Sequence, residues 1–492
     1  MRSSPARLLL LAVPVLVLLL ACSDDEPVAF TSGVAAFEAA PDGAVLWTRA
    51  DREATLTLEV AADESFSQIA ATQDVSAELA RDFTAHATVT GLLPATPYYY
   101  RFRHGDTVSA TGTFRTAQAV DDASPLRFIF SGGSDGSMRD DGSPAFDFRV
   151  LETALADEPD FFLYVGDTIA PGRSTLDWLR ARYQVNRNVT PLVRLLAATA
   201  TYATWDDSEL APDFAGTSVE PDQLAKAYQA FREYFPVRPD AGFPYRRVRQ
   251  GSAVELFILD TRTYRDDNVA AACTPGGATT PDVLPALGAP DTPEAYRALR
   301  AAIGLPPDSD VDCLNALSNP ARTLLGADQR EWLLAALEDS SATFKFIVAP
   351  APISEIIAQP YDRWEGYRAE RDVILRAIAE RDIENVIFLS TDLQASLIAD
   401  VRVDLASQPV AVEAVAGPIA AETLGAAIAR GQGERAVPVY EQLFQQVALV
   451  SCTAFDAYSY GLVEVDPAAG TATITLKDED GAQLCRTVVQ AP

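Results

Sequence analysis

The chain is 492 residues long and carries a formal net charge of −30. This length is enough for two or three domains. The negative charge argues against nucleic acid as a partner, because binding to a phosphate backbone requires a basic surface. A metal cation, in contrast, would be drawn to such a protein.

Residues 1–22 have the pattern of an export signal. Arg2 and Arg7 precede an apolar run from Leu8 to Ala21, which at about 14 residues is shorter than the roughly 20 needed to span a bilayer. The run ends at Cys22, and a polar segment follows. We therefore expect an exported bacterial lipoprotein, lipidated at Cys22 and anchored to a membrane in the periplasm or at the cell surface. An ordinary secretory signal is the alternative.

Four further cysteines lie beyond the signal. An even number of cysteines in an exported chain favours disulfides, and pairing each cysteine with its nearest neighbour in sequence joins Cys273 to Cys313 and Cys452 to Cys485. Free thiols remain an alternative. A zinc site is not expected, because the short C-x-x-C spacing is missing.

Residues 23–120 have the pattern of a β-sandwich domain. Short apolar stretches alternate with turn signals about every 8 to 12 residues, a spacing typical of sandwiches. The predicted strands are Ala44–Trp47, Ala54–Val60, Phe83–Val89, Tyr98–Arg103 and Thr111–Arg115.

Residues 121–492 predict an α/β domain, because continuous apolar runs alternate with helical stretches such as Thr175–Val185 and Arg330–Glu338. A β-hairpin is expected over Gly461–Val465 and Thr471–Leu476. Helices on both sides of two sheets would fit this order of elements. The predicted buried strands are Phe128–Phe130, Phe161–Val165, Tyr202–Trp205, Leu256–Leu259, Phe346–Val348 and Val386–Leu389.

Three of these strands are followed by aspartates: Asp167, the pair Asp206-Asp207, and Asp392. Open α/β sheets bind ligands at the carboxyl edge of their strands, so converging carboxylates there predict a cation site. The alternative is that each aspartate caps a following helix. Asp135, in a nearby glycine-rich loop, is a weaker candidate ligand, and Asp260 with Arg262 is expected to form a buried structural ion pair.

Several ordered segments resemble the alkaline phosphatase D (PhoD-like) family. The resemblance covers nearly the whole chain after the signal. Its motifs are Val45-Leu46-Trp47-Thr48-Arg49, Tyr164-Val165-Gly166-Asp167, Thr204-Trp205-Asp206-Asp207, Leu259-Asp260-Thr261-Arg262-Thr263-Tyr264-Arg265, Leu325-Gly326-Ala327-Asp328-Gln329, Trp364-Glu365-Gly366-Tyr367 and Tyr460-Gly461.

The resemblance implies a four-layer αββα metallophosphatase-like domain, preceded by a fibronectin III-like β-sandwich with a tyrosine corner near Tyr98. It also implies hydrolysis of phosphate mono- or diesters at a centre that combines iron with calcium. Asp167, Asp207 and Asp392 match three of the family's metal ligands.

Four positions depart from the family pattern. Gly132 stands in place of a cysteine, Ala170 of a tyrosine, and Ser208 and Gln394 of histidines. Thiolate and imidazole suit transition metals, whereas carboxylates suit calcium, magnesium or manganese. We therefore expect one of these hard divalent cations and no iron. The catalytic residue stays unassigned, since the family's histidine position is Ser208.

Two functions follow from this pattern. The first is a metal-dependent phosphoric ester hydrolase with a reduced, carboxylate-only centre, acting on a phosphate ester. The second is a catalytically inactive relative that binds calcium or a phosphorylated ligand at the cell surface.

Overall fold

The computed structural model describes residues 27–239, 242–270, 272–273, 311–355, 362–404, 407–447 and 450–492. The predicted signal peptide and Cys22 lie outside the described residues, as does most of the insertion between Cys273 and Cys313. Within the described part, no helix has the length and apolar character needed to cross a membrane.

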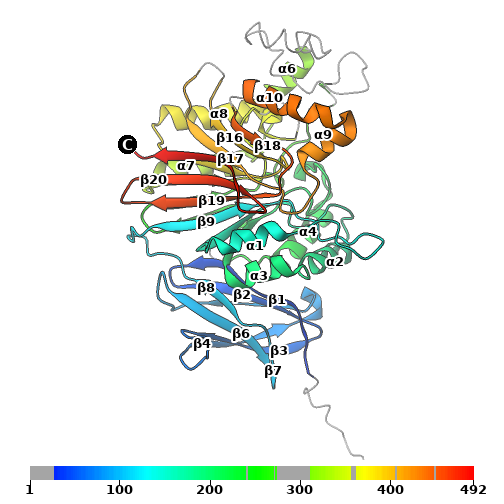
Figure 1. The fold of residues 1–492 in the computed structure, drawn as a ribbon, viewed down its shortest axis with the longest axis vertical. Coiled ribbons are helices and arrows are strands. Elements are labelled where there is room, and N and C mark those ends of the chain that lie inside the picture. The colour runs from blue at the N-terminus through cyan, green and yellow to red at the C-terminus, as the bar shows by residue number, and fades with distance from the viewer. Residues whose placement is uncertain are drawn as a thin grey trace, which may run out of the picture.

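The N-terminal region is a two-layer β-sandwich (Figure 1). One layer has the strand order β4-β3-β6-β7, with β8 paired to β6, and the other contains β1, β2 and β5. The predicted tyrosine corner is present, because the Leu93 amide donates a hydrogen bond to the Tyr98 hydroxyl at 3.1 Å. The strands are β1 (Phe30–Ala40), β2 (Gly43–Ala50), β3 (Ala54–Ala61), β4 (Ile69–Ala77), β5 (Thr84–Val89), β6 (Pro97–His104), β7 (Thr107–Val108) and β8 (Gly112–Arg115).

The second sandwich layer continues into the main sheet of the molecule. This nine-stranded sheet has the order β21-β20-β19-β9-β10-β11-β1-β2-β5, and β1 pairs in parallel with β11, Phe37 facing Thr201. A domain boundary near residue 120 therefore divides the chain but not the sheet. The added strands are β9 (Leu126–Ser131), β10 (Phe161–Val165), β11 (Ala200–Thr204), β19 (Ser459–Asp466), β20 (Thr471–Asp478) and β21 (Gln483–Gln490).

A second sheet of seven strands packs against the first, in the order β12-β13-β14-β15-β17-β16-β18. The interface is apolar, and Phe128 of β9 meets Phe346 of β14 edge to face with ring centroids 5.3 Å apart. The strands are β12 (Arg246–Gln250), β13 (Val254–Ile258), β14 (Phe344–Val348), β15 (Val386–Ser390), β16 (Ser396–Val401), β17 (Ala411–Val415) and β18 (Val450–Ala454).

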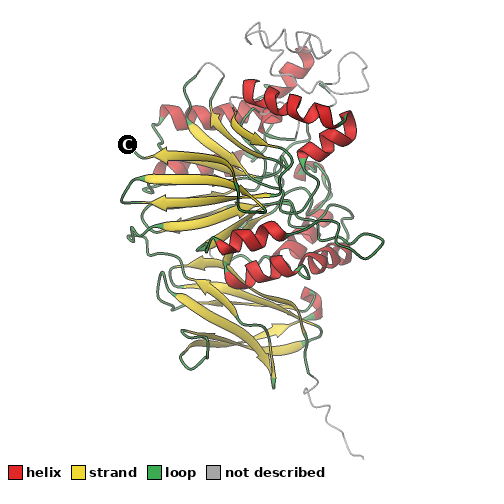
Figure 2. Ribbon diagram, in the orientation of Figure 1, coloured by secondary structure: helices red, strands yellow, loops and turns green. Residues whose placement is uncertain are grey.

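Helices cover the outer face of each sheet, which gives the four-layer αββα arrangement (Figure 2). The first sheet is covered by α1 (Arg149–Ala156), α2 (Leu176–Asn186), α3 (Thr190–Ala198) and α4 (Pro221–Tyr234). The second is covered by α7 (Ala327–Asp339) and α8 (Arg368–Glu380), with α9 (Leu424–Gln432) and α10 (Val437–Val447) beside β16 and β18. The arrangement is therefore the predicted four-layer α/β domain preceded by a β-sandwich.

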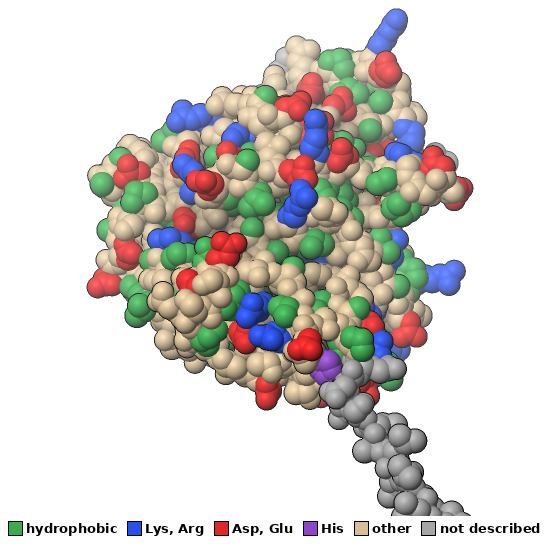
Figure 3. All heavy atoms as spheres, turned by 60° about the horizontal axis from the view of Figure 1, so that its bottom comes forward, with side chains coloured by type: hydrophobic (Ala, Val, Ile, Leu, Met, Phe, Trp, Pro, Cys, Tyr) green, Lys and Arg blue, Asp and Glu red, His purple; other side chains and the backbone are tan. Residues whose placement is uncertain are grey.

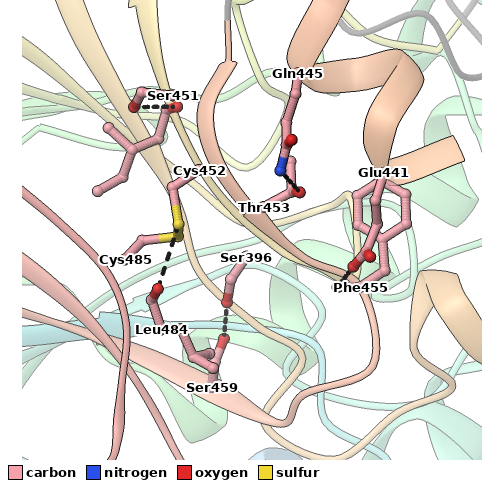
Figure 4. The surroundings of a disulfide bond; sticks show 11 residues. Ser396, Glu441, Gln445, Ser451, Cys452, Thr453, Phe455, Ser459, Leu484 and Cys485 are labelled. Carbon is pink, nitrogen blue, oxygen red and sulfur yellow. Dashed lines mark hydrogen bonds between the residues drawn. A yellow bond between two sulfur atoms is a disulfide. The ribbon is translucent and has the colours of Figure 1, made fainter. Parts of the chain in front are cut away.

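The described residues contain the two predicted disulfides. Cys273 is joined to Cys313, at the start of the short helix α6 (Val311–Leu317), and Cys452 is joined to Cys485. The second bond links β18 of the seven-stranded sheet to β21 of the nine-stranded sheet (Figure 4). It therefore connects the two sheets covalently.

Charged side chains are intermixed on the face that lies at the bottom of Figure 1. Figure 3 shows acidic and basic groups interspersed with uncharged ones there. The net negative charge of the chain is thus not gathered into one acidic patch on this face.

Candidate metal centre

The three predicted aspartates meet at the carboxyl edges of the two sheets. Asp167 follows β10, Asp392 follows β15, and Asp207 follows β11 together with Asp206. Each of the four offers a carboxylate oxygen, and these oxygens all lie within 4.8 Å of one another. Asp206 belongs to this group as well, although the family resemblance predicts only Asp207 of the pair as a ligand.

The backbone conformation at Asp167 directs its carboxylate toward the other aspartates. Gly166 and Asp167 both have positive φ, +74° and +52°, a conformation that is costly for a residue with a side chain. Glycine is required at 166, because a Cβ there would lie 2.7 Å from the Cβ of Asp206. Strand β10 thus ends in a tight turn that places Asp167 beside Asp206.

Burial and mutual repulsion make this group of carboxylates costly to ionise. Burial, reinforced by Asp207 and Asp206, raises the pKa of Asp167 well above its usual range. Burial likewise raises the pKa of Asp206 to about 7, and that of Asp392 well above its usual range. A cation among them would favour the ionised forms.

Arg262 supplies positive charge to the same group. Its fully buried guanidinium donates to both carboxylate oxygens of Asp206 and to both of Asp362, and it lies 3.6 Å from Asp392. Arg265 donates to Asp362 as well, at 2.6 Å. Burial opposes ionisation of Asp362, but the two arginines hold its pKa below the usual range.

The predicted ion pair between Asp260 and Arg262 is wrong, because the Arg262 guanidinium binds Asp206 and Asp362 instead. Asp260 accepts a hydrogen bond from the Arg262 backbone amide at 2.9 Å and one from the Trp205 indole at 3.0 Å. The guanidinium points the other way, toward the aspartate cluster. The sequence places Asp260 two residues from Arg262, whereas Asp362 is a hundred residues away, so proximity in the chain suggested the wrong partner.

Two of the positions that depart from the family pattern contact Asp167. The Gln394 amide donates to Asp167 Oδ2 at 3.1 Å, and the Ser208 backbone N–H donates to Asp167 Oδ1 at 3.4 Å. Neither group is a strong base at neutral pH. Glu209, next to Ser208, accepts hydrogen bonds from the Asp206 and Thr168 amides and so holds the two strand ends together.

The other two departures, Gly132 and Ala170, lie at buried positions. A Cβ at Gly132 would lie 2.4 Å from the Val165 carbonyl oxygen, and Ala170 is buried. Asp135 is directed elsewhere, accepting from Ser137 and Arg182, and it is not part of the carboxylate group.

The donor set consists of carboxylate oxygens. Among the described residues, the grouping that could hold a metal consists of four carboxylates. Thiolate and imidazole, the donors that favour transition metals, are not among them. Carboxylate oxygens are the ligands that calcium, magnesium and manganese prefer.

Comparison with known proteins agrees with this architecture. Residues 141–476 match the family of PhoD-like phosphatases, and residues 20–118 match the N-terminal domain of that family. Alkaline phosphatase D of Bacillus subtilis (strain 168) is 27% identical over 426 residues, which cover 76% of this chain and 66% of the relative. The aligned region thus spans slightly less than two thirds of the relative's length.

Two solved structures share the fold. A structure of PhoD superposes with a TM-score of 0.73 at 22% identity, covering 94% of this chain and 90% of the other. The purple acid phosphatase PPD1 from yellow lupin (Lupinus luteus) seeds superposes with a TM-score of 0.55 at 9% identity, covering 93% and 74%.

Proposed function

The chain belongs to the PhoD-like phosphatase family, and we propose that it is a phosphoric ester hydrolase that uses one hard divalent cation. The observation that carries this proposal is the convergence of four carboxylate oxygens within 4.8 Å at the carboxyl edges of both sheets. Without a cation, these buried groups repel one another.

Asp167, Asp206, Asp207 and Asp392 would hold calcium, magnesium or manganese. A cation bound there would polarise the phosphoryl group and lower the pKa of water. The protein's own side chains hold the ligands of this cation in place. Arg262 fixes Asp206, the Gln394 amide fixes Asp167, and Glu209 holds the backbone of both strand ends.

We expect slow turnover, because the family's histidine position is Ser208. A positioned general acid typically contributes about 10²- to 10⁴-fold to the rate, and serine cannot serve as one at neutral pH. The same observation favours a second candidate, in which the centre binds a cation and a phosphorylated ligand without hydrolysing it.

Elemental analysis of the purified protein, beside a generic phosphodiester assay with added calcium, magnesium or manganese, tests the proposal. We expect the protein to hydrolyse the phosphodiester. EDTA should abolish this activity, and the Asp167→Asn variant should lack it. Cation binding without hydrolysis would favour the second candidate. Stoichiometric iron, or no cation at all, would refute the carboxylate-only centre.

We further propose that the mature protein is a lipoprotein attached through Cys22, because the apolar run of the signal ends there and a polar segment follows. Cys22→Ala should then release the protein from the membrane fraction or leave its signal uncleaved. Unchanged membrane partitioning, with a mature chain that starts away from residue 22, would contradict lipidation.

A further inference from the structure

An aromatic pocket lies at the start of β12, beside α7 and apart from the metal centre. Three rings line it, those of Tyr245 just before β12, Tyr264 after β13 and Trp332 on α7. The pocket has a volume of about 330 Å³, which falls within the roughly 300–1,000 Å³ of small-molecule sites. None of the four clustered aspartates lines it, so it is a separate feature of the molecule.

The three rings are held in a fixed arrangement. The Tyr245 ring lies 4.9 Å from the Trp332 ring and 6.2 Å from the Tyr264 ring, centroid to centroid, and is inclined to them by 54° and 70°. The rings therefore form an open corner rather than a parallel slot. Gly326 permits this arrangement, because a Cβ there would lie 2.8 Å from the Cβ of Tyr264. A ligand would meet rings that do not have to be ordered first, which lowers the entropic cost of binding.

Each of these rings also carries a polar atom that the protein does not use. Among the described residues, no group forms a hydrogen bond with the Tyr245 hydroxyl, the Tyr264 hydroxyl or the Trp332 indole N–H. By contrast, the indole of Trp205 and the hydroxyl of Tyr228 both donate to Asp260. The pocket thus presents apolar ring faces together with free polar atoms, and such a surface suits a ligand that has both characters.

The charges at the pocket favour a neutral ligand. Arg246 and Arg247 also line it, but Arg246 is paired with Glu38, and Arg247 is paired with Asp339 at 3.0 Å and Glu255 at 3.8 Å. These pairings leave neither arginine with an unmatched charge for an anion. The two guanidinium groups also oppose an organic cation, which aromatic rings alone would attract.

We propose that this pocket binds a sugar ring of a carbohydrate, an activity separate from the proposed hydrolysis at the metal centre. A pyranose is neutral, its C–H groups pack against aromatic faces, and the hydroxyls around its edge reach the free polar atoms of Tyr245, Tyr264 and Trp332. A flat aromatic ligand would stack on one of the inclined rings only and would leave these polar atoms without partners.

Calorimetric titration of the purified protein with maltotetraose, cellotetraose and chitotetraose tests the proposal. We expect saturable binding of at least one of these sugars, with contacts from its ring C–H protons in saturation-transfer NMR. The affinity should be the same in EDTA and in the Asp167→Asn variant, because the pocket shares no residue with the carboxylate cluster.

Two substitutions locate the binding site. Trp332→Ala and Tyr264→Ala should each raise the Kd of the sugar roughly tenfold. Tyr264 is 37% exposed, so its replacement tests the pocket even if Trp332→Ala does not fold. Tyr264→Phe, which keeps the ring and loses the hydroxyl, should have a smaller effect. Trp178→Ala is the matched control, since Trp178 is also half-buried but stands on α2 and does not line the pocket.

The outcomes separate this proposal from the proposed hydrolase. The absence of saturable binding of all three sugars, or binding that is unchanged in both Trp332→Ala and Tyr264→Ala, would overturn the sugar site and leave the metal centre standing. Sugar binding that is lost in Asp167→Asn would place the ligand at the metal centre instead. Choline and inorganic phosphate serve as charged comparison probes, and tighter binding of either one that Trp332→Ala removes would show that the pocket is built for a charged ligand.

Discussion

Asp167 contacts two of the positions that depart from the family pattern, and it stands in a strained backbone conformation. We expect Asp167→Asn to abolish stabilisation by divalent cations, which in the wild type should reach about 2.7 kcal/mol at a cation concentration of 100 Kd. In EDTA the variant should be at least as stable as the wild type, because a repulsive charge is gone.

Thermal unfolding with and without each cation measures both effects. Asp135→Asn is the matched control, since Asp135 contacts Arg182 and Ser137 outside the cluster. Equal cation stabilisation of the Asp167 variant and the wild type would show that the ligands lie elsewhere.

The substitution Gly132→Cys tests whether this position can accommodate the cysteine that the family has there. The Cβ of Gly132→Cys would approach the Val165 carbonyl oxygen to 2.4 Å, and because that atom belongs to the backbone the strand end must shift. We expect a loss of about 1–3 kcal/mol in the free energy of unfolding, as for overpacked cores, and no gain of iron. Denaturant unfolding and elemental analysis provide the readouts.

Gly431→Ala is the control for that substitution, because a Cβ at Gly431, within α9, meets no atom within 4 Å. It should stabilise the protein by roughly 0.5–1 kcal/mol. A Gly132→Cys variant that is as stable as the wild type and binds iron would contradict the steric argument.

His86 should make stability depend on pH. Burial, with Arg81 and Arg232 nearby, lowers the pKa of His86 to about 4 from 6.5. Between these values the unfolded chain binds the proton and the folded protein does not, so this contribution to stability is present above pH 6.5 and is lost as the pH falls toward 4. The loss attributable to this residue should be about 1–3 kcal/mol.

Urea unfolding at pH 7 and pH 5 measures this dependence. The difference between the two pH values should be smaller in His86→Gln than in the wild type, which isolates the histidine from the carboxylates. An identical pH dependence in both proteins would contradict a neutral, buried imidazole.

At the scale of elements, the buried strands were the easiest to predict. Strand β10 is an unbroken apolar run, Phe161–Val165, and all of it is buried, so composition alone identifies it. Strand β1 has four alanines and one glycine among its 11 residues and therefore has weak intrinsic β-propensity. It forms because β2 and β11 pair with its two edges, which the local sequence does not reveal.

The same limit applies to the candidate metal centre. Residues marked by their local sequence could be predicted, whereas pairings between distant segments could not. Asp167, Asp207 and Asp392 are recognisable because each follows an apolar strand. The pairing of Arg262 with Asp362 spans a hundred residues, and no pattern in either segment identifies the partner. Strand β4 was missed for a different reason, since most of its residues are exposed on a sheet edge and show no clear alternation.

The disulfide between β18 and β21 should contribute to the stability of the two-sheet core. Its cysteines are 33 residues apart, and closing a loop of that length is worth roughly 4 kcal/mol in the chain-entropy model. The double variant Cys452→Ser/Cys485→Ser should lose stability of that order in denaturant unfolding.

Peptide mapping without reductant should recover the Cys452–Cys485 and Cys273–Cys313 peptides. The wild type and the double serine variant should be equally stable when both are unfolded under reducing conditions. Crossed pairs or free thiols in the native protein would contradict this arrangement.

At the scale of the whole molecule, the N-terminal strands and the phosphatase-like region share one sheet and one buried core. Trp47 of β2 donates to the Glu233 carbonyl of α4 at 2.7 Å, and buried Arg187 stacks over the Trp47 ring at 4.5 Å. Deletion of residues 27–118 would leave the β11 edge unpaired and these groups uncovered.

We therefore expect the truncated protein to aggregate, as exposed flat edge strands do, whereas the protein that lacks only residues 1–26 should not aggregate. Soluble yield and size-exclusion chromatography compare the two. A truncated chain that does not aggregate and unfolds cooperatively would show that the large region folds independently.

The shared sheet also bears on how such a protein can change in evolution. A β-sandwich joined to its neighbour only by a linker can be exchanged between genes as a cassette, but here the parallel pairing of β1 with β11 crosses the apparent domain boundary. Recombination near residue 120 would leave two incomplete sheets, so the two regions are expected to be inherited together. Strand β11 also leads directly to Asp206. An insertion or shift in the N-terminal strands would therefore displace the carboxylate cluster, because backbone hydrogen bonds join β1 to β11.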